Sequence, residues 1–207
     1  MSKPVRLHLL RHGPTTAPQG CFAGSTDLPL SGQGLEGLPA LLPHLQGVEM
    51  WHCSPLRRAC QTLEHLRTQG CRIEQPLYDA RLREIDFGAW EMKTFAEIAA
   101  AAPEKITAWQ EDYEGFVFPE GEAVADFLCR TKEMLAVLAA SGSQVAAVTH
   151  GGVIRAMLCA ALNLPPRSYL LFDVRPASLT VLDIFSQGAV LRALNLPVCH
   201  PSVFSAL

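Results

Sequence analysis

The chain has 207 residues, of which 49% are hydrophobic and 18% charged, and its 17 Lys and Arg against 20 Asp and Glu give a formal net charge of −3. This length suits one large α/β domain or two small ones, and the composition excludes a disordered or fibrous protein. The weak negative charge gives no electrostatic basis for nucleic acid or an anionic membrane as the main partner, and we expect neither.

Neither a membrane span nor an export signal is predicted. No apolar run approaches the roughly 20 residues that a membrane helix needs, and Arg6 and His8 interrupt the first apolar stretch. The seven cysteines are an odd number, and no two are spaced C-x-x-C. This usage favours reduced thiols and a cytoplasmic location, and it argues against a cysteine-based zinc site.

The first half of the chain contains two short predicted strands and one clear helix start. Apolar and polar residues alternate over 5–10, which predicts a strand, and the Gly- and Pro-rich segment 14–34 predicts a long loop. Ser54 followed by Pro55 is typical of a helix start, so we expect Ser54 to be the N-cap of a helix that ends before Gly70. The other expected elements are a helix over 35–46, a strand over 50–53, an extended segment over 72–77 and a loop over 80–93.

In the second half, strands and helices alternate. The most regular apolar spacing predicts a helix over 122–140, and small and β-branched residues predict a buried strand over 144–149. The remaining expected elements are helices over 95–102, 104–110 and 153–162 and closing strands over 169–174, 179–185 and 189–194. This alternation predicts a single α/β domain with a largely parallel sheet.

Two of the predicted strands end in a histidine followed by glycine, with Arg-His-Gly at 11–13 and His-Gly-Gly at 150–152. Ligands collect at the carboxyl ends of parallel strands, so His12 and His150 can face each other if their strands are neighbours. The glycines allow close approach to a ligand, and the free N–H groups that start the following helix favour an anion.

Three arginines lie close to the ends of predicted strands. Arg11 precedes His12, while Arg57 and Arg58 fall in the first turn of the helix after 50–53, where a positive charge opposes the helix dipole. A guanidinium group suits phosphate oxygens, so these residues predict a site for a phosphoryl group. Two alternatives stay open at this point. A histidine pair can hold a metal, although no acidic ligand stands beside either histidine, and each residue alone could be an ordinary solvated side chain.

Five stretches, in this order, resemble the motifs of the histidine phosphatase superfamily, the phosphoglycerate-mutase-like enzymes. They are Leu10-Arg11-His12-Gly13-x-Thr15, Gly24-x-x-Asp27-x-Pro29-Leu30-Ser31-x-x-Gly34, Ser54-Pro55-Leu56-x-Arg58-Ala59-x-Gln61-Thr62, Leu82-x-Glu84-Ile85-x-Phe87-Gly88-x-Trp90-Glu91 and Val148-Thr149-His150-Gly151-Gly152-Val153-Ile154-Arg155. The resemblance runs from about residue 5 to 185. It implies a three-layer α/β/α sandwich with a mostly parallel central sheet, formed by one domain over 1–207, in which 92–120 are a helical insertion over the active site.

The resemblance also implies roles for single residues. His12 is expected to be the nucleophile that becomes a phosphohistidine, and Glu84 the proton donor to the leaving alcohol. The expected phosphate- or substrate-binding residues are Arg11, His12, Thr15, Gly24, Arg58, His150 and Gly151, with Arg57 outside the pocket. No cofactor and no metal are expected. We expect the partner to be a small phosphomonoester, in a monomer or an oligomer.

The sequence departs from the family pattern at Pro18, where many members have Asn, and at Pro14, where an acidic or polar residue is common. The mutases of the family are longer, which favours a phosphatase. The segment 118–127 resembles the start of the long helix in bacterial α-ribazole-5′-phosphate phosphatases, which serve cobalamin synthesis, although Glu120 and Ala123 replace the Gly and Ser of that group. The alternatives are a broad-range sugar-phosphate phosphatase, a phosphoglycerate mutase and a phospholigand-binding module without activity.

Overall fold

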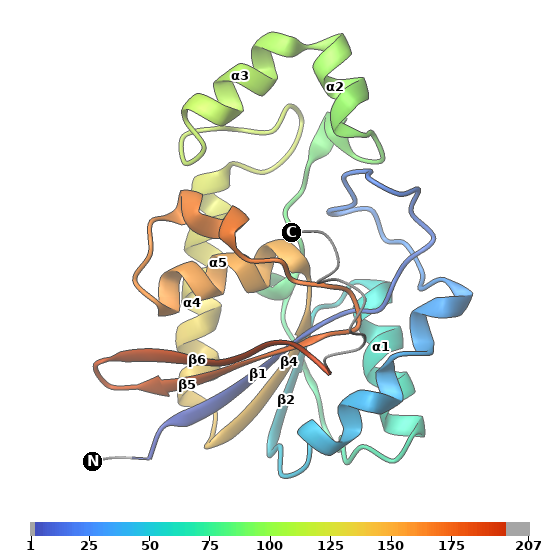
Figure 1. The fold of residues 1–207 in the computed structure, drawn as a ribbon, viewed down its shortest axis with the longest axis vertical. Coiled ribbons are helices and arrows are strands. Elements are labelled where there is room, and N and C mark those ends of the chain that lie inside the picture. The colour runs from blue at the N-terminus through green and yellow to red at the C-terminus, as the bar shows by residue number, and fades with distance from the viewer. Residues whose placement is uncertain (1–2, 198–207) are drawn as a thin grey trace, which may run out of the picture.

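A six-stranded sheet in the order β3-β2-β4-β1-β5-β6 forms the centre of the computed structural model, which describes residues 3–197 (Figure 1). The strands are β1 (Val5–Arg11), β2 (Met50–Cys53), β3 (Leu77–Tyr78), β4 (Gln144–Thr149), β5 (Leu179–Phe185) and β6 (Gly188–Leu196). Strands β3, β2, β4 and β1 are parallel, whereas β5 and β6 pair antiparallel at one edge. The prediction of a mostly parallel sheet is therefore confirmed.

Helices cover both faces of this sheet. The α-helices are α1 (Arg57–Thr68), α2 (Phe95–Ala101), α3 (Pro103–Glu111), α4 (Val124–Ala140) and α5 (Gly151–Ala161). Short 3₁₀ helices lie at Gly32–Leu35, Leu38–His44, Ala80–Leu82, Gly88–Trp90 and Pro166–Leu171. No helix within residues 3–197 is long and apolar enough to cross a membrane.

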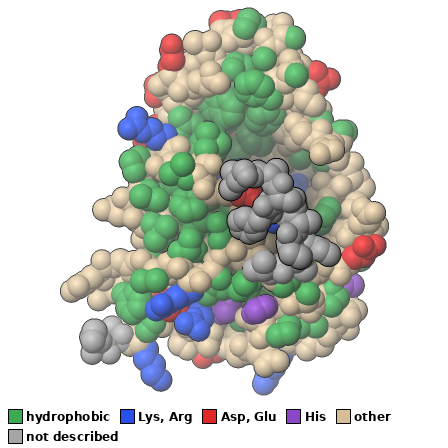
Figure 2. Space-filling view, viewed as in Figure 1, with side chains coloured by type: hydrophobic (Ala, Val, Ile, Leu, Met, Phe, Trp, Pro, Cys, Tyr) green, Lys and Arg blue, Asp and Glu red, His purple; other side chains and the backbone are tan. Residues whose placement is uncertain are grey.

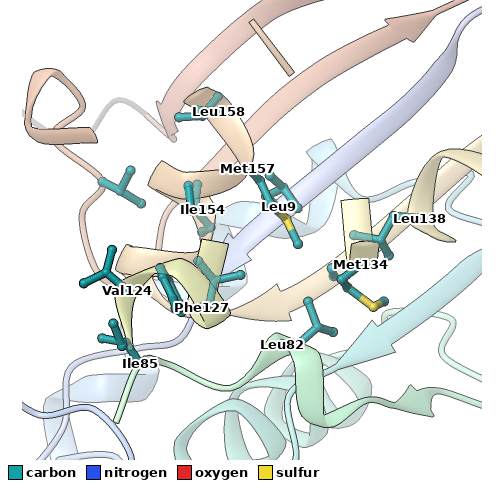
Figure 3. Close-up of a cluster of buried hydrophobic side chains, with 14 of the residues drawn as sticks. Leu9, Leu82, Ile85, Val124, Phe127, Met134, Leu138, Ile154, Met157 and Leu158 are labelled. Carbon is teal, nitrogen blue, oxygen red and sulfur yellow. The ribbon is translucent and has the colours of Figure 1, made fainter. Parts of the chain in front are cut away.

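Successive side chains of a strand point to opposite faces of the sheet, and this divides the core into two layers. In β1, Leu7 and Leu9 join a cluster with α4 and α5, while Leu10 faces the opposite cluster with α1 and the 3₁₀ helix Leu38–His44. Figure 3 shows the first cluster, in which side chains of α4 and α5 pack against Leu9. Burial on both faces explains the continuous apolar run of β4, and the two clusters give the predicted α/β/α sandwich.

The register of β1 and β4 brings the two predicted strand ends together. Arg11 lies opposite Thr149 in the parallel ladder, and the backbone N–H of His12 donates to the carbonyl oxygen of Thr149 at 3.0 Å. His12 and His150 are therefore the first residues beyond two adjacent strands, as the sequence analysis required for them to meet.

Helices α2 and α3 lie beyond the carboxyl ends of the strands, at the top of Figure 1. Thr94 and Glu97 form a capping box at the start of α2, and Pro103 occupies the first turn of α3. Both helices lie close to their predicted bounds. An aromatic cluster packs between them and the rest of the molecule; it includes Phe22, Trp90, Trp109, Phe116 and Phe118.

The strand predicted over 169–174 is wrong. The chain forms the 3₁₀ helix Pro166–Leu171 instead, because Pro165 and Pro166 lead into a helical turn rather than a ladder. Leu170 and Leu171 are 73% and 78% exposed, so this apolar run is not a buried strand. Of the segment 72–77, only its last residue enters a strand, β3.

The helix after β2 begins later than predicted. Its N-cap is Leu56 and its first residue is Arg57, not Pro55, and the Ser54 hydroxyl accepts from the Leu56 N–H at 3.3 Å. The segment 35–46 is helical only over Leu38–His44 and only as a 3₁₀ helix, because Pro43 cannot donate an α-helical hydrogen bond.

Candidate active site

His12 and His150 face each other at the ends of β1 and β4. Their ring centroids are 5.0 Å apart, and the rings are tilted by 57°. His12 is 7% exposed and His150 is fully buried. Two arginines, Arg11 and Arg58, complete this group, and we call the four residues the histidine pocket.

One hydrogen bond fixes the protonation of His12. Its Nδ1 lies 2.7 Å from the carbonyl oxygen of Gly13, which can only accept, so Nδ1 carries the proton and Nε2 keeps its lone pair. Burial lowers the pKa of His12 well below its ordinary value, and the charges of Arg11 and Arg58 lower it further. His12 is therefore a neutral imidazole with a free nucleophilic nitrogen near neutral pH.

Arg11 holds a positive charge beside His12. Its Nη1 donates to the carbonyl oxygen of Val174 at 2.5 Å, which fixes the guanidinium group. Its Nε is buried and has no hydrogen-bond partner among residues 3–197. A buried donor without a partner is costly, and an anionic oxygen in the pocket would satisfy it.

Arg58 is 1% exposed, whereas Arg57 beside it is exposed, as the family resemblance implied. The Arg58 guanidinium donates to the carbonyl oxygens of Gly24 at 2.6 Å and Thr26 at 2.8 Å, and its Nε donates to Nδ1 of His150 at 3.1 Å. Three of its five N–H groups are thereby used to hold the cation in place.

His150 uses both ring nitrogens within the protein. Because Nδ1 accepts from Arg58, Nε2 carries the proton and donates to the Ser54 hydroxyl at 2.8 Å. Burial lowers the pKa of His150 well below its ordinary value, and the charges of Arg58 and Arg11 add to this effect. His150 is thus held as a neutral ring beside His12.

Two hydroxyl groups that support the pocket were not predicted from the sequence. Ser54 was predicted as a helix cap, but its hydroxyl accepts from His150. Thr62 accepts from the Gly13 N–H at 3.1 Å and donates to the Arg58 carbonyl oxygen at 2.8 Å, so it links β1 to α1. Both residues lie within a quoted motif, yet their roles depend on contacts between distant segments.

Glu84 lies against the first turn of α5. Its Oε2 accepts from the Gly152 N–H at 2.9 Å and its Oε1 from the Ile85 N–H at 3.3 Å. A side chain at position 152 would clash with the Glu84 carboxylate, so glycine there lets the carboxylate reach the start of α5. The carboxylate thus meets the positive end of the α5 dipole.

Arg130 of α4 fixes the segment that carries Glu84. It donates to the carbonyl oxygens of Arg81 at 2.9 Å, Arg83 at 2.7 Å and Glu84 at 3.2 Å, and it pairs with Glu122 at 2.6 Å. This positioning residue was not predicted, because no local pattern relates α4 to the loop at 80–84.

Glu91 organises the backbone that receives Arg58. Its carboxylate accepts from the N–H groups of Gly24 at 3.1 Å, Ser25 at 2.8 Å and Thr26 at 3.3 Å. A side chain on Gly24 would clash with the carbonyl oxygen of Ile85. Gly24 therefore contributes its carbonyl oxygen to Arg58 and allows close packing against residues 85–91.

Of the other predicted binding residues, Thr15 lines the cleft and Gly151 does not. The Thr15 hydroxyl accepts from the Ala17 N–H at 3.3 Å, and its backbone pairs with Leu30, so it shapes the loop at 14–34. Gly151 is buried, and a Cβ there would lie 3.2 Å from Cζ of Arg11. It makes room for Arg11.

A cleft of about 650 Å³ leads to the histidine pocket. Six aromatic side chains also line this cleft, and we call them the aromatic wall: Phe22, Phe87, Trp109, Tyr113, Phe118 and Tyr169. Tyr113 and Tyr169 stack with centroids 4.6 Å apart, and Nε1 of Trp109 is buried with no partner among residues 3–197. Figure 2 shows hydrophobic side chains gathered on this part of the surface.

No group of three or more His, Cys, Asp or Glu side chains in residues 3–197 could hold a metal ion. The charge in the pocket comes from the two arginines, and both histidines interact with protein groups. This arrangement supports attack by Nε2 of His12 on an electrophilic atom that carries negatively charged oxygens. The carboxyl group of Glu84 lines the same cleft.

The sequence matches the Histidine phosphatase superfamily (branch 1) over residues 7–197. The chain belongs to this superfamily and is a phosphatase of it. It is 29% identical over 196 residues to the adenosylcobalamin/alpha-ribazole phosphatase of Escherichia coli K12, covering 92% of this chain and 96% of the relative.

Solved structures agree with this assignment. The alpha-ribazole phosphatase from Shigella flexneri superimposes with a TM-score of 0.81 at 28% identity, covering 92% of this chain and 96% of that structure. A mycobacterial glucosyl-3-phosphoglycerate phosphatase in complex with inorganic phosphate gives a TM-score of 0.76 at 30% identity, covering 94% and 97%. The family, the fold and the phosphatase class that the motifs implied are therefore confirmed.

Proposed function

We propose that this phosphatase hydrolyses phosphomonoesters through a phosphohistidine intermediate on Nε2 of His12, without a metal. The observation that carries the proposal is the hydrogen bond from Nδ1 of His12 to the Gly13 carbonyl oxygen, which leaves Nε2 unprotonated. The low pKa of His12 supports the same role, because a protonated imidazole cannot attack phosphorus.

The first step transfers the phosphoryl group from the substrate to His12. Nε2 of His12 forms a bond to phosphorus while the bond to the ester oxygen breaks. Glu84, which must enter this step protonated, gives its proton to the leaving alkoxide. Arg11 and Arg58 balance the negative charge on the equatorial oxygens, which is the main requirement of phosphoryl transfer. The unpartnered Nε of Arg11 suits one of these oxygens.

The second step returns the pocket to its starting state. The Glu84 carboxylate takes a proton from water, the water oxygen attacks phosphorus, and the bond to Nε2 of His12 breaks. His150 stays neutral and holds Arg58 in place through Nδ1. Two guanidinium groups match the two negative charges of a phosphate ester, so the reaction needs no added cation.

The aromatic wall supports a substrate with a large aromatic leaving group, and we propose α-ribazole-5′-phosphate, in cobalamin synthesis. Trp109, Tyr113 and Tyr169 offer faces for stacking, and the free N–H of Trp109 offers a hydrogen bond to a ring nitrogen. The relatives named for alpha-ribazole match over nearly their whole length. In this proposal, residues 92–120 are the insertion of a single domain that shapes the substrate site.

A panel of phosphomonoesters tests both parts of the proposal. We expect turnover of p-nitrophenyl phosphate that survives EDTA, loss of turnover in His12→Ala with the fold kept, and the highest kcat/KM for α-ribazole-5′-phosphate. Loss of activity in EDTA, or full activity of His12→Ala, would contradict the mechanism. A preference for small sugar phosphates would contradict only the substrate, whereas faster isomerisation of phosphoglycerates than phosphate release would contradict hydrolysis itself.

A further inference from the structure

Two cysteines meet next to the histidine pocket without taking part in it. Cys53 is the last residue of β2 and is fully buried, and Cys60 lies in the first turn of α1 and is partly exposed. Both are free thiols. Their Sγ atoms lie 3.2 Å and 3.5 Å from the same acceptor, the carbonyl oxygen of Ser54.

The surroundings make Cys60 the reactive member of this pair. The neighbouring Cys53 thiol lowers the pKa of the Cys60 thiol to about 7, whereas the contact with Cys60 and burial raise the pKa of Cys53. The N-terminal end of α1 also favours a thiolate. Burial raises the pKa of Cys71, in contrast. Cys60 thus combines thiolate character, access from solvent and a second thiol at hand.

The shared acceptor links the pair to the active site. Ser54 accepts both thiols with its carbonyl oxygen and accepts Nε2–H of His150 with its hydroxyl. Arg58 lies between Ser54 and Cys60 in the sequence, in the same helical turn as Cys60, and holds Nδ1 of His150. A bond between the two sulfurs would remove both S–H donors from Ser54 and pull the start of α1 toward β2.

We propose that Cys53 and Cys60 form a reversible disulfide when the protein meets a hydroperoxide, and that this disulfide lowers phosphatase activity by displacing Ser54 and Arg58. First, the Cys60 thiolate attacks the peroxide oxygen, which breaks the O–O bond, forms a sulfenic acid and releases water or an alcohol. The sulfur of Cys53 then attacks the Cys60 sulfur, the S–O bond breaks, and the hydroxyl group leaves with the Cys53 proton as water. The two sulfurs give two electrons to the peroxide.

Peptide mapping tests the site directly. Arg57 and Arg58 lie between the two cysteines, so trypsin places Cys60 in one peptide and Cys53, together with Cys21, in the peptide of residues 12–57. In Cys21→Ser, only a disulfide between Cys53 and Cys60 can join these two peptides. After treatment with hydrogen peroxide and blocking of free thiols with iodoacetamide, we expect the joined peptide, and we expect dithiothreitol to abolish it. Separate, alkylated peptides at both positions would overturn the proposal.

Activity on p-nitrophenyl phosphate tests the consequence. We expect peroxide to lower the activity of the wild-type protein at least about tenfold, because small displacements of positioned groups have large effects, and dithiothreitol to restore it. Cys60→Ser keeps a donor for Ser54, and we expect it to resist peroxide. Cys129→Ser changes an exposed cysteine away from the pair and should respond like the wild type. Equal inactivation of Cys60→Ser and wild type, or a disulfide that leaves activity unchanged, would overturn the proposal.

Discussion

The histidine pocket and the aromatic wall face the same cleft but are built differently. In the pocket, every side chain is held by hydrogen bonds, and for Arg11, Arg58 and His150 these come from distant segments, as Arg58 contacts Gly24, Thr26 and His150. The aromatic wall consists of rings in contact, and its most buried polar atom, Nε1 of Trp109, has no partner in residues 3–197. Preorganised polar groups suit a reaction with a fixed charge pattern, whereas apolar contacts select among leaving groups.

Loss of Arg58 should have the largest effect, and its neighbour provides a control. We expect Arg58→Gln to lower kcat/KM for p-nitrophenyl phosphate by about 10³-fold, because it removes a charge from the pocket and the partner of His150. Arg57→Gln changes an exposed arginine one residue away and should keep kcat/KM within about twofold. Steady-state kinetics on both variants, with circular dichroism to verify the fold, decides this; similar losses in the two variants would contradict the assignment.

Glu84→Gln should lower activity in a way that depends on the leaving group. We expect a loss of about 10²-fold or more with an alkyl phosphate, since its alkoxide needs a proton, and a much smaller loss in phosphoryl transfer from p-nitrophenyl phosphate. Pre-steady-state kinetics on the two substrates measures this transfer step. An equal loss with both would mean that Glu84 is not the proton donor.

Changes in the aromatic wall should alter selectivity more than chemistry. We expect Trp109→Leu to lower kcat/KM for α-ribazole-5′-phosphate by up to about tenfold, the upper end of the roughly 0.5–1.5 kcal/mol typical of aromatic contacts. The same variant should leave kcat/KM for glycerol phosphate nearly unchanged, because that leaving group has no ring to stack. Comparable losses for both substrates would mean that Trp109 supports the structure of the histidine pocket and does not select the substrate.

The buried histidines predict how stability depends on pH. The pKa of His12 is lowered in the folded protein, so the unfolded chain binds its proton more readily below about pH 6.5. Stability is therefore full above that pH and falls as the pH drops toward the folded pKa. We expect His12→Gln to reduce this slope by up to about 1.4 kcal/mol per pH unit.

Denaturant unfolding between pH 5 and 8 measures that slope. His44→Gln changes an exposed histidine and serves as the control, with a slope expected to equal that of the wild type. His8, His52 and His150 also have lowered pKa values, so a residual slope should persist in His12→Gln. An unchanged slope in His12→Gln would contradict a neutral, buried His12.

The same contrast separates what the sequence predicted from what it could not. The histidine pocket could be predicted from short local patterns, because each of its histidines directly follows a predicted strand. The parallel pairing of β1 with β4 then brings His12 and His150 together. Ser54 and Arg130 were missed, since their roles depend on contacts with His150 and with the loop at 80–84. The prediction of a strand over 169–174 was wrong because composition alone does not show whether an apolar run is buried. Leu171 in this run is exposed.

The intermediate on His12 is the central claim, and trapping it is the most direct test. The protein is mixed with ³²P-labelled substrate, quenched within milliseconds in alkali, which preserves phosphohistidine, and digested for peptide mapping. We predict label on the peptide that contains His12, at Nε2, and none in His12→Ala. Turnover without label on His12, or label on His150 instead, would contradict the mechanism.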